Sequence, residues 1–180
     1  YVDDFGDLHV GPQSAGSSPG PACYGRGGTE PTVTDANVVL GRIAPGSFWN
    51  GRQTLDREAA ERAITLNVAE PLGLSCVEAA LGIVDIVDAR MADLLRTMTV
   101  STGYDPRDFV LFAYGGAGPV HVGSYAAQLE VSKIYVPIFA PVQSAFGIAT
   151  GELRRHHTKA VPMREPYDMT AVRIAIEEIK

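Results

Sequence analysis

The sequence predicts an α/β fold, and three observations lead to this prediction. Residues 109–114 and 133–137 are apolar runs of strand length, which is typical of strands that are covered on both faces. The residues between them begin with a glycine-rich turn and continue, over 120–129, with a helical pattern. Strand, helix and strand in this order form a βαβ unit with parallel strands and a right-handed crossover. We therefore expect an at least partly parallel sheet with flanking helices.

The first part of the chain, residues 1–50, is irregular and rich in turn-forming residues. A turn at residues 4–7 between short apolar flanks predicts a hairpin. The following stretch is dense in glycine, proline and serine, which is typical of flexible linkers, but Cys23, Tyr24 and Arg26 interrupt it. Since these residue types commonly pack or bind, we expect an ordered functional loop and keep the linker as the alternative.

Two short helices are predicted next. Residues 35–42 form a helix with Asp35 as its N-cap and Gly41 as its stop. Residues 56–70 form a second helix, whose apolar face consists of Ala59, Ala63, Leu66 and Ala69.

The longest helix is predicted over residues 76–102. Ser75 and Glu78 have the spacing of a capping box at its start, and Gly103 ends it. One buried stripe follows the three-four spacing of a helix face: Val77, Ala80, Leu81, Val84, Val87, Met91, Leu94, Leu95 and Met98.

The remaining segments are assigned from shorter patterns. Residues 105–108 are a turn before the first strand, 144–152 a short helix, 157–162 an edge strand and 168–180 an acidic amphipathic helix. Because the chain begins with Tyr rather than Met and its last helix lacks an end, we expect a single lobe that is a fragment of a larger subunit. Its portions are the glycine-rich loop region 1–50, the helical 51–104, the βαβ portion 105–165 and the truncated helix 166–180.

Composition excludes several function classes. The chain has 180 residues, and its 15 basic and 21 acidic residues give a net charge of −6. That balance argues against binding nucleic acid or anionic membranes, and no apolar run reaches the length of a membrane span. Cys23 and Cys76 are too few for a disulfide framework or a four-cysteine zinc site, so we expect a cytoplasmic protein.

The best candidate for a binding site is the glycine-rich turn. Glycine lets a ligand lie against the backbone, and the start of the following helix offers free N–H groups that suit phosphate. The turn also follows the carboxyl end of a strand, where open α/β sheets bind ligands. The predicted nucleotide-binding residues are Gly115, Gly116, Ala117, Gly118 and Pro119.

Known phosphate-binding templates do not match this turn. No Lys-Ser or Lys-Thr pair follows the glycines, as a Walker A loop requires. In the dinucleotide pattern, His121 stands where the third glycine belongs, and no acidic residue closes the next strand. A tight strand-to-helix turn without a ligand therefore stays an alternative.

Other chemically capable residues have structural explanations as well. His121 on the first turn of the helix is either packed, exposed or in contact with a ligand. Cys23 is near Arg26, which could lower the pKa of its thiol, but no histidine base can be assigned to it, so a buried structural thiol is the other interpretation. His156 and His157 lack a matched carboxylate at metal spacing.

Asp35, Asn37 and Arg42 could form a polar cluster at a helix end, although capping alone explains Asp35. No Ser-His-Asp order, catalytic base or set of metal ligands can be identified. From the residues alone the chain is an α/β lobe with a candidate anion or nucleotide turn.

Several blocks of sequence occur in a particular order, and the first of them is long and unusual in composition. Gly-Pro-Gln-Ser-Ala-Gly-Ser-Ser-Pro-Gly-Pro-Ala-Cys-Tyr-Gly-Arg-Gly-Gly at 11–28 continues into Pro-Thr-Val-Thr-Asp-Ala-Asn at 31–37 and Leu-Gly-Arg at 40–42. Asp-Pro-Arg-Asp-Phe at 105–109 precedes the glycine-rich turn, and Gln-Ser-Ala-Phe-Gly follows at 143–147. In this order the blocks resemble signatures of the hydantoinase A / 5-oxoprolinase family. The match covers most of residues 8–152.

The resemblance implies an ATP-dependent enzyme that hydrolyses a cyclic amide such as hydantoin, N-methylhydantoin or 5-oxoproline. Relatives in that family couple ATP to the carboxylation of ketones. The resemblance further implies a mixed sheet in a ribonuclease-H-like lobe of the actin, Hsp70 and acetate-kinase type. ATP and Mg²⁺ are the implied cofactors, and a hydantoinase B-type subunit or fused region is the implied partner.

The resemblance also implies roles for particular residues. Residues 115–119 resemble the adenosine-side turn of such a lobe. The loop of Gly25, Arg26, Gly27 and Gly28 is implied to border the cleft or the partner subunit, and Arg26 could pair with a phosphate or carboxylate. The same cleft or partner loop is the implied place of Cys23, Asp35, Asn37, Arg42 and His121.

The two phosphate-gripping turns of this fold are absent from the sequence, so the chain would hold half a nucleotide site and be inactive alone. Three readings stay open: the cyclic amidase, a ketone carboxylase subunit, and a non-catalytic assembly module whose glycine loops face a partner. A dinucleotide-binding domain is disfavoured by the motif.

Overall fold

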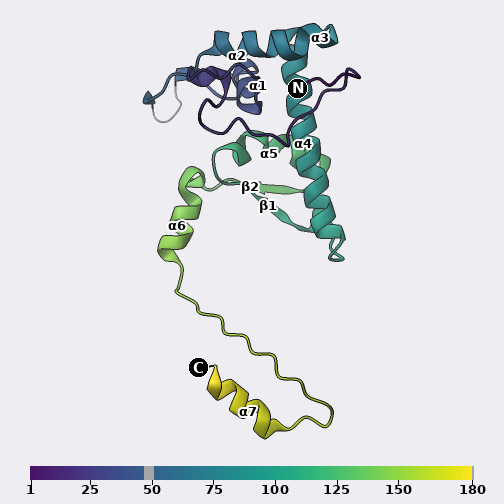
Figure 1. Ribbon diagram of the computed structural model, residues 1–180, viewed down its shortest axis with the longest axis vertical. Coiled ribbons are helices and arrows are strands. Elements are labelled where there is room, and N and C mark those ends of the chain that lie inside the picture. Colours follow the sequence, from purple (N-terminus) through teal and green to yellow (C-terminus); the bar gives the residue numbers. More distant parts are fainter. Residues whose placement is uncertain (47–50, 180) are drawn as a thin grey trace. The chain divides into compact units, whose positions relative to one another are not determined.

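The computed structural model describes residues 1–46 and 51–179. The chain divides into two compact units, Tyr1–Gln143 and Ser144–Lys180. The division falls inside the range 105–165 that the sequence analysis treats as one portion. Figure 1 shows the elements of each unit, which are described separately below.

The chain begins with a minimal hairpin. An isolated antiparallel bridge joins Val2 to Leu8, and the carboxylate of Asp3 accepts hydrogen bonds from the N–H groups of Phe5 and Asp7. The predicted hairpin around residues 4–7 is therefore confirmed. A short 3₁₀ turn, η1 (Ala22–Tyr24), follows within the glycine-rich loop.

Helix α1 (Val33–Val39) starts earlier than predicted. Its N-cap is Thr32, whose side chain accepts a hydrogen bond from the N–H of Asp35, while the Asp35 carboxylate accepts one from the N–H of Thr32. The prediction of Asp35 as N-cap is wrong because this reciprocal capping box places it inside the first turn. Gly41, with φ at +72°, ends the helix as predicted.

Helices α2 (Arg57–Ile64) and α3 (Glu70–Leu72) are joined through a π-helical segment, η3 (Thr65–Ala69), and end at Gly73. The predicted apolar face is wrong at Leu66, which is exposed. A π-helical turn is wider than an α-turn and shifts the residues that follow it around the axis. The buried residues are Ala60, Ala63, Ile64, Val68 and Ala69.

Helix α4 (Cys76–Val100) has the predicted capping box of Ser75 and Glu78, but its buried face differs from the predicted stripe. The predicted members Val77, Leu81, Leu94 and Met98 are all at least 41% exposed. Within the predicted stripe, Ala80 and Val84 are buried and Met91 and Leu95 are partly buried, so the prediction is right at these positions. The buried residues are Ala79, Ala80, Ile83, Val84, Asp88 and Ala92.

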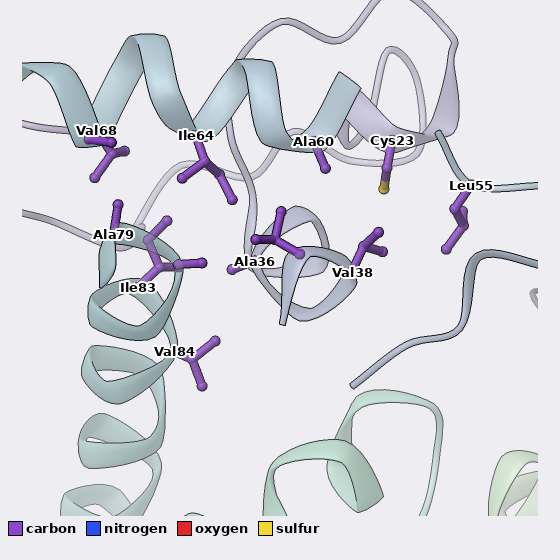
Figure 2. Close-up of a cluster of buried hydrophobic side chains, with 13 residues drawn as sticks. Cys23, Ala36, Val38, Leu55, Ala60, Ile64, Val68, Ala79, Ile83 and Val84 are labelled. Atoms are coloured by element: carbon purple, nitrogen blue, oxygen red, sulfur yellow. The ribbon is translucent and has the colours of Figure 1, made fainter. Parts of the chain in front are cut away.

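Two apolar clusters line α4. Figure 2 shows the first, in which side chains from α1, α2 and α4 point toward one another and the Cys23 thiol lies at one end. The second lies between α4, strand β1 and helix α5, with Ala92, Ala113, Val122, Tyr125, Ala126 and Leu129 buried. Helix α4 thus connects the glycine-rich half of this unit to the sheet.

The predicted βαβ unit is confirmed. Strands β1 (Val110–Phe112) and β2 (Lys133–Tyr135) pair in parallel, with α5 (Ala117–Gln128) between them in sequence. The expectation that both faces are covered is wrong: Leu111 packs on the second cluster, whereas Val110 and Phe112 are exposed. In this unit the helices cover a single face of the two-stranded sheet.

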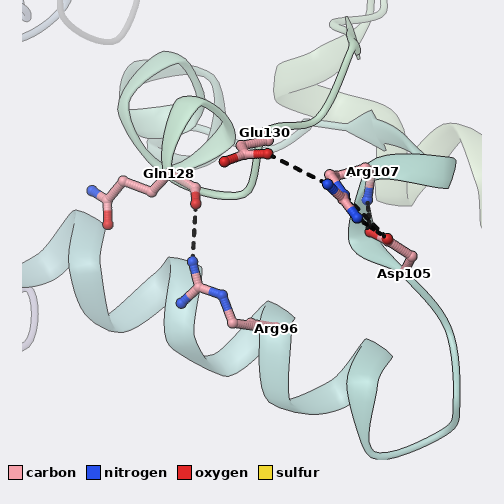
Figure 3. A network of polar contacts seen from close by, with 5 residues as sticks. All are labelled: Arg96, Asp105, Arg107, Gln128 and Glu130. Atoms are coloured by element: carbon pink, nitrogen blue, oxygen red, sulfur yellow. Dashed lines mark hydrogen bonds and ion pairs between the residues drawn. The ribbon is translucent and has the colours of Figure 1, made fainter.

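A polar network ties this unit together (Figure 3). The predicted turn before β1 is a 3₁₀ turn, η4 (Pro106–Asp108), capped by Asp105. Arg107 pairs with Asp105 at 2.6 Å and with Glu130, just beyond α5, at 3.8 Å. Arg96 of α4 donates to the carbonyl of Gln128 at 2.9 Å. Arg107 thus joins the turn before β1 to the residue after the end of α5, and Arg96 joins the end of α5 to α4.

The predicted short helix near residue 144 is α6 (Gln143–Thr150), preceded by the 3₁₀ turn η5 (Ala140–Val142). The second unit also contains α7 (Met169–Glu178), capped by Asp168. The predicted edge strand at 157–162 is wrong, since these residues have no regular secondary structure and no paired strand. No helix within the described ranges is long and apolar enough to cross a membrane.

Candidate functional site

The glycine-rich turn lies between the carboxyl end of β1 and the start of α5. Gly115 has φ at +82°, which favours glycine, and its N–H donates to the carbonyl of Ala140 at 2.8 Å. Helix α5 begins at Ala117 with Gly116 as its N-cap, so Pro119 lies inside the first turn and the predicted start at residue 120 is late.

The turn is open on its outer side. A methyl group built on Gly115, Gly116 or Gly118 would meet no atom within 4 Å. Packing therefore does not require these glycines. No side chain caps α5, and the first N–H groups of an α-helix have no partner within the helix. The free space beside the glycines and the N–H groups at the start of α5 together suit an anionic or polar ligand that lies against the backbone.

The glycine-rich loop before α1 is held by one buried carboxylate. Asp35 is fully buried and accepts hydrogen bonds from the N–H groups of Ala22 at 3.2 Å, Cys23 at 2.7 Å and Thr32 at 2.8 Å. The Thr32 hydroxyl donates to the same carboxylate at 2.7 Å. This arrangement is that of an ordered loop rather than a flexible linker.

A cavity of about 920 Å³ lies beside this loop. Gly27 and Gly28 line it, together with residues of the 9–16 and 29–34 segments, whereas Gly25 and Arg26 do not. Arg26 donates instead to the carbonyl of Ser17 and to the Gln53 side chain, and it stacks over the ring of Tyr24. Of the predicted loop, Gly27 and Gly28 therefore line the cavity, whereas Arg26 makes contacts that hold the loop itself.

Cys23 lies in a setting that does not support a nucleophile. Its side chain is fully buried, and this burial, with the Asp35 carboxylate beside it, raises the pKa of the thiol far above its ordinary value. Arg26 bonds elsewhere and does not offset this. The thiol is an apolar member of the first core cluster.

A buried polar cluster lies behind the glycine-rich turn. His121 Nδ1 is 2.6 Å from Asp88 Oδ1, and the side-chain nitrogen of Asn37 is 3.0 Å from His121 Nε2. Arg42 Nη1 lies 3.6 Å from Asp88 Oδ2. Asn37, Asp88 and His121 are at most 3% exposed. The cluster brings together α1, the residues after it, α4 and α5.

Both ring nitrogens of His121 have a polar partner, Asp88 at Nδ1 and the side chain of Asn37 at Nε2. Asn37 Oδ1 and Asp88 Oδ2 have no hydrogen-bond partner. His121 is therefore packed beneath the turn rather than exposed at its surface.

The predicted polar cluster consisted of Asp35, Asn37 and Arg42. Asn37 and Arg42 belong to the cluster around His121, whereas the Asp35 carboxylate binds backbone N–H groups of the glycine-rich loop. The sequence analysis missed Asp88. The available signal was its spacing of four residues from Val84 and from Ala92, which places a carboxylate on an otherwise apolar helix face. His156 and His157 are exposed, and no group of three or more His, Cys, Asp or Glu side chains converges anywhere in residues 1–46 and 51–179.

Comparisons with known proteins agree with this architecture. The sequence profile described as hydantoinase/oxoprolinase matches residues 1–157. The caprolactamase subunit alpha of Pseudomonas jessenii is 42% identical over 100% of this chain and 26% of its own length. The acetophenone carboxylase gamma subunit of Aromatoleum aromaticum is 51% identical over 77% of this chain and 19% of its own.

A solved structure gives the same result. The nucleotide-free acetone carboxylase, from work on ATP-dependent acetone carboxylation, superposes with a TM-score of 0.82 at 35% identity, over 99% of this chain and 26% of that one. The chain thus spans about a quarter of the length of such relatives. A match over most of its residues, at this level of identity, means that the chain belongs to the hydantoinase/oxoprolinase family.

Proposed function

We propose that the full-length protein is an ATP-dependent hydrolase of a cyclic amide, and that this chain supplies part of its nucleotide-binding lobe. The observation that carries the proposal is the open, uncapped glycine-rich turn at the carboxyl end of β1. Open α/β sheets bind their ligands at such positions. The 42% identity to a caprolactamase subunit over the whole chain supports the cyclic amide as substrate.

The lobe is proposed to be of the ribonuclease-H-like type found in actin, Hsp70 and acetate kinase. Gly115–Pro119 would then receive the adenosine side of the nucleotide, and the rest of the subunit would grip the phosphates. When bound, ATP would supply a γ-phosphoryl group to the amide oxygen and make the ring carbon a better target for water. The contribution of this chain is to orient the nucleotide through backbone rather than side-chain contacts.

Mg²⁺ ordinarily neutralises the phosphates in phosphoryl transfer. The described part of this chain offers no converging set of carboxylates or imidazoles for it, so no step is assigned to a metal here. We propose that the isolated chain is inactive, and that a B-type subunit or fused region completes the enzyme. The subunit names of the relatives support a multi-chain assembly.

A ketone carboxylase subunit is the second candidate. The 51% identity to an acetophenone carboxylase subunit favours it, although that match covers less of the chain than the caprolactamase match does. Both candidates would use the same nucleotide turn, since they differ in the acceptor of the phosphoryl group. Only the substrate separates them.

The test is ADP release by the full-length protein with its B-type partner. The substrates are 5-oxoproline, hydantoin, N-methylhydantoin and caprolactam, followed by acetone or acetophenone with bicarbonate. We expect a cyclic amide to stimulate ADP release. Stimulation by ketone and bicarbonate alone would identify the carboxylase. No stimulation by any of them would favour the assembly module, for which Gly116→Arg would weaken subunit association and leave nucleotide affinity unchanged.

A further inference from the structure

The first turn of α5 has few contacts of its own. No side chain caps its N-terminus, and Pro119 has no N–H to donate. A Cβ added to Gly115, Gly116 or Gly118 would meet no atom within 4 Å apart from the neighbouring residues and the helix itself. The N–H of Gly115 donates to the carbonyl of Ala140. A turn with so little intrinsic support needs to be held from behind.

His121 supplies that support. It is the fifth residue of α5, and its ring binds Asp88 of α4 through one nitrogen and Asn37 of α1 through the other. Helices α1 and α4 pack together in the first apolar cluster (Figure 2). The ring therefore connects the glycine-rich turn to the best-packed part of this unit.

Stability alone does not account for these polar groups. Asn37 Oδ1 is buried without a hydrogen-bond partner, which is unfavourable. Asp88 Oδ2 has no hydrogen bond either, and the Arg42 guanidinium 3.6 Å away is its charged partner. Apolar residues of similar volume often replace a buried polar cluster with no loss of stability. What apolar contacts lack is direction, whereas two hydrogen bonds at opposite ends of a rigid ring define both its place and its orientation.

We propose that His121, held by Asp88 and Asn37, is a positioning residue that sets the conformation of the Gly115–Pro119 turn for nucleotide. The inference rests on the proposed function, because it assumes that nucleotide lies on this turn. His121 touches no ligand and acts through the backbone of α5. Loss of its hydrogen bonds should weaken nucleotide binding while leaving the ring substrate and the chemical step largely unaffected.

The test uses the full-length protein with its partner and three variants. His121→Leu removes both hydrogen bonds, Asn37→Ala removes one, and His121→Asn can still donate to Asp88 because its amide nitrogen reaches the position of Nδ1. The matched control is Val122→Ala, which removes buried volume from the next residue of the same helix. Each protein is assayed for the Kd of a fluorescent ATP analogue, for Tm, and for KM and kcat.

We expect the Kd for the analogue and the KM for ATP to rise about tenfold or more in His121→Leu. The rise should be smaller in Asn37→Ala and partly reversed in His121→Asn. The KM for the ring substrate and kcat at saturating ATP should stay near wild type. Val122→Ala should lower Tm without changing the Kd. Should His121→Leu not fold, Asn37→Ala carries the test, since it removes one contact.

The proposal is overturned if His121→Leu and Asn37→Ala lower Tm, as Val122→Ala does, but leave the nucleotide Kd unchanged, because the cluster would then be structural only. A wild-type protein that binds no nucleotide would contradict the proposed function itself, and with it this inference. A wild-type protein that binds nucleotide tightly, with unaffected variants, contradicts the positioning role alone.

Discussion

At the scale of single residues, glycines in this chain meet two different needs. Gly28 is required by packing, because a methyl group on it would lie 2.2 Å from the carbonyl oxygen of Gly20. Gly118 and Gly123, both in α5, have free space around them. Sequence composition alone does not distinguish these three glycines. Their surroundings decide which one is structural.

Replacing Gly28 and Gly123 by alanine should change the stability of the protein in opposite directions. In the full-length protein, Gly28→Ala forces two backbone segments apart and should destabilise it by about 1–3 kcal/mol, as overpacking does. Gly123→Ala should stabilise it by up to about 1 kcal/mol, because glycine is unfavourable in a helix interior. Urea unfolding of both variants measures the difference. Equal stabilities would contradict the close approach of residues 20 and 28.

The open turn leads to a prediction about binding. Gly118→Val puts a side chain into the space beside the turn, so we expect a loss of affinity for an ATP analogue of about tenfold or more. Valine before Pro119 also disfavours the helical conformation, so Tm is measured for the same variant. Gly123→Val, further along the same helix, is the control and should bind as the wild type does. Unchanged binding in Gly118→Val would mean that the nucleotide does not lie against this turn.

At the scale of elements, the start of α4 was easier to predict than its buried face. The capping box of Ser75 and Glu78 is a local pattern, and it forms as expected at the start of α4. The predicted buried face of the same helix is right at Ala80 and Val84, but several of its larger apolar members are exposed. Which face is buried depends on the neighbouring helix, and periodicity does not reveal that neighbour.

The junction before β1 gives a prediction about pH. Hydrogen bonds from the Arg107 side chain and backbone hold the pKa of Asp105 down to about 2, from an ordinary 3.8. Because the pKa of Asp105 is lower in the folded state than in the unfolded state, the ionised carboxylate stabilises the fold at pH values above about 4. This contribution is lost as the pH falls from about 4 toward 2. Arg107→Ala should raise the pKa of Asp105 without fully restoring it, since the backbone N–H still donates.

Carboxyl ¹³C NMR titration of Asp105 measures this shift directly. Arg96→Ala serves as the control, because Arg96 donates to the Gln128 carbonyl (Figure 3). It also pairs with Asp93 and makes no contact with Asp105. This variant should leave the titration of Asp105 unchanged. A pKa of Asp105 that stays near 2 in Arg107→Ala would assign the depression to the backbone alone.

At the scale of the whole molecule, this chain is about a quarter of the length of its relatives. Strands β1 and β2 form a sheet with one exposed face within the described residues. The glycine-rich turn offers backbone groups without charged side chains close by in sequence. An ATP site also needs groups that bind the phosphates, and residues 115–119 contain none with a positive charge. This lack of positively charged residues agrees with the proposal that the chain supplies only part of the nucleotide site.

The sequence by itself determined the βαβ order, the start of the longest helix, the glycine-rich turn and the family resemblance, because each depends on neighbouring residues or on fixed spacing. Only the tertiary structure decided that Asp35 holds the glycine-rich loop, that Asp88 and Asn37 meet His121, and which face of α4 is buried. These contacts join residues 12 to 84 positions apart. Their partners are chosen by how whole helices pack, so no local pattern in the chain identifies them.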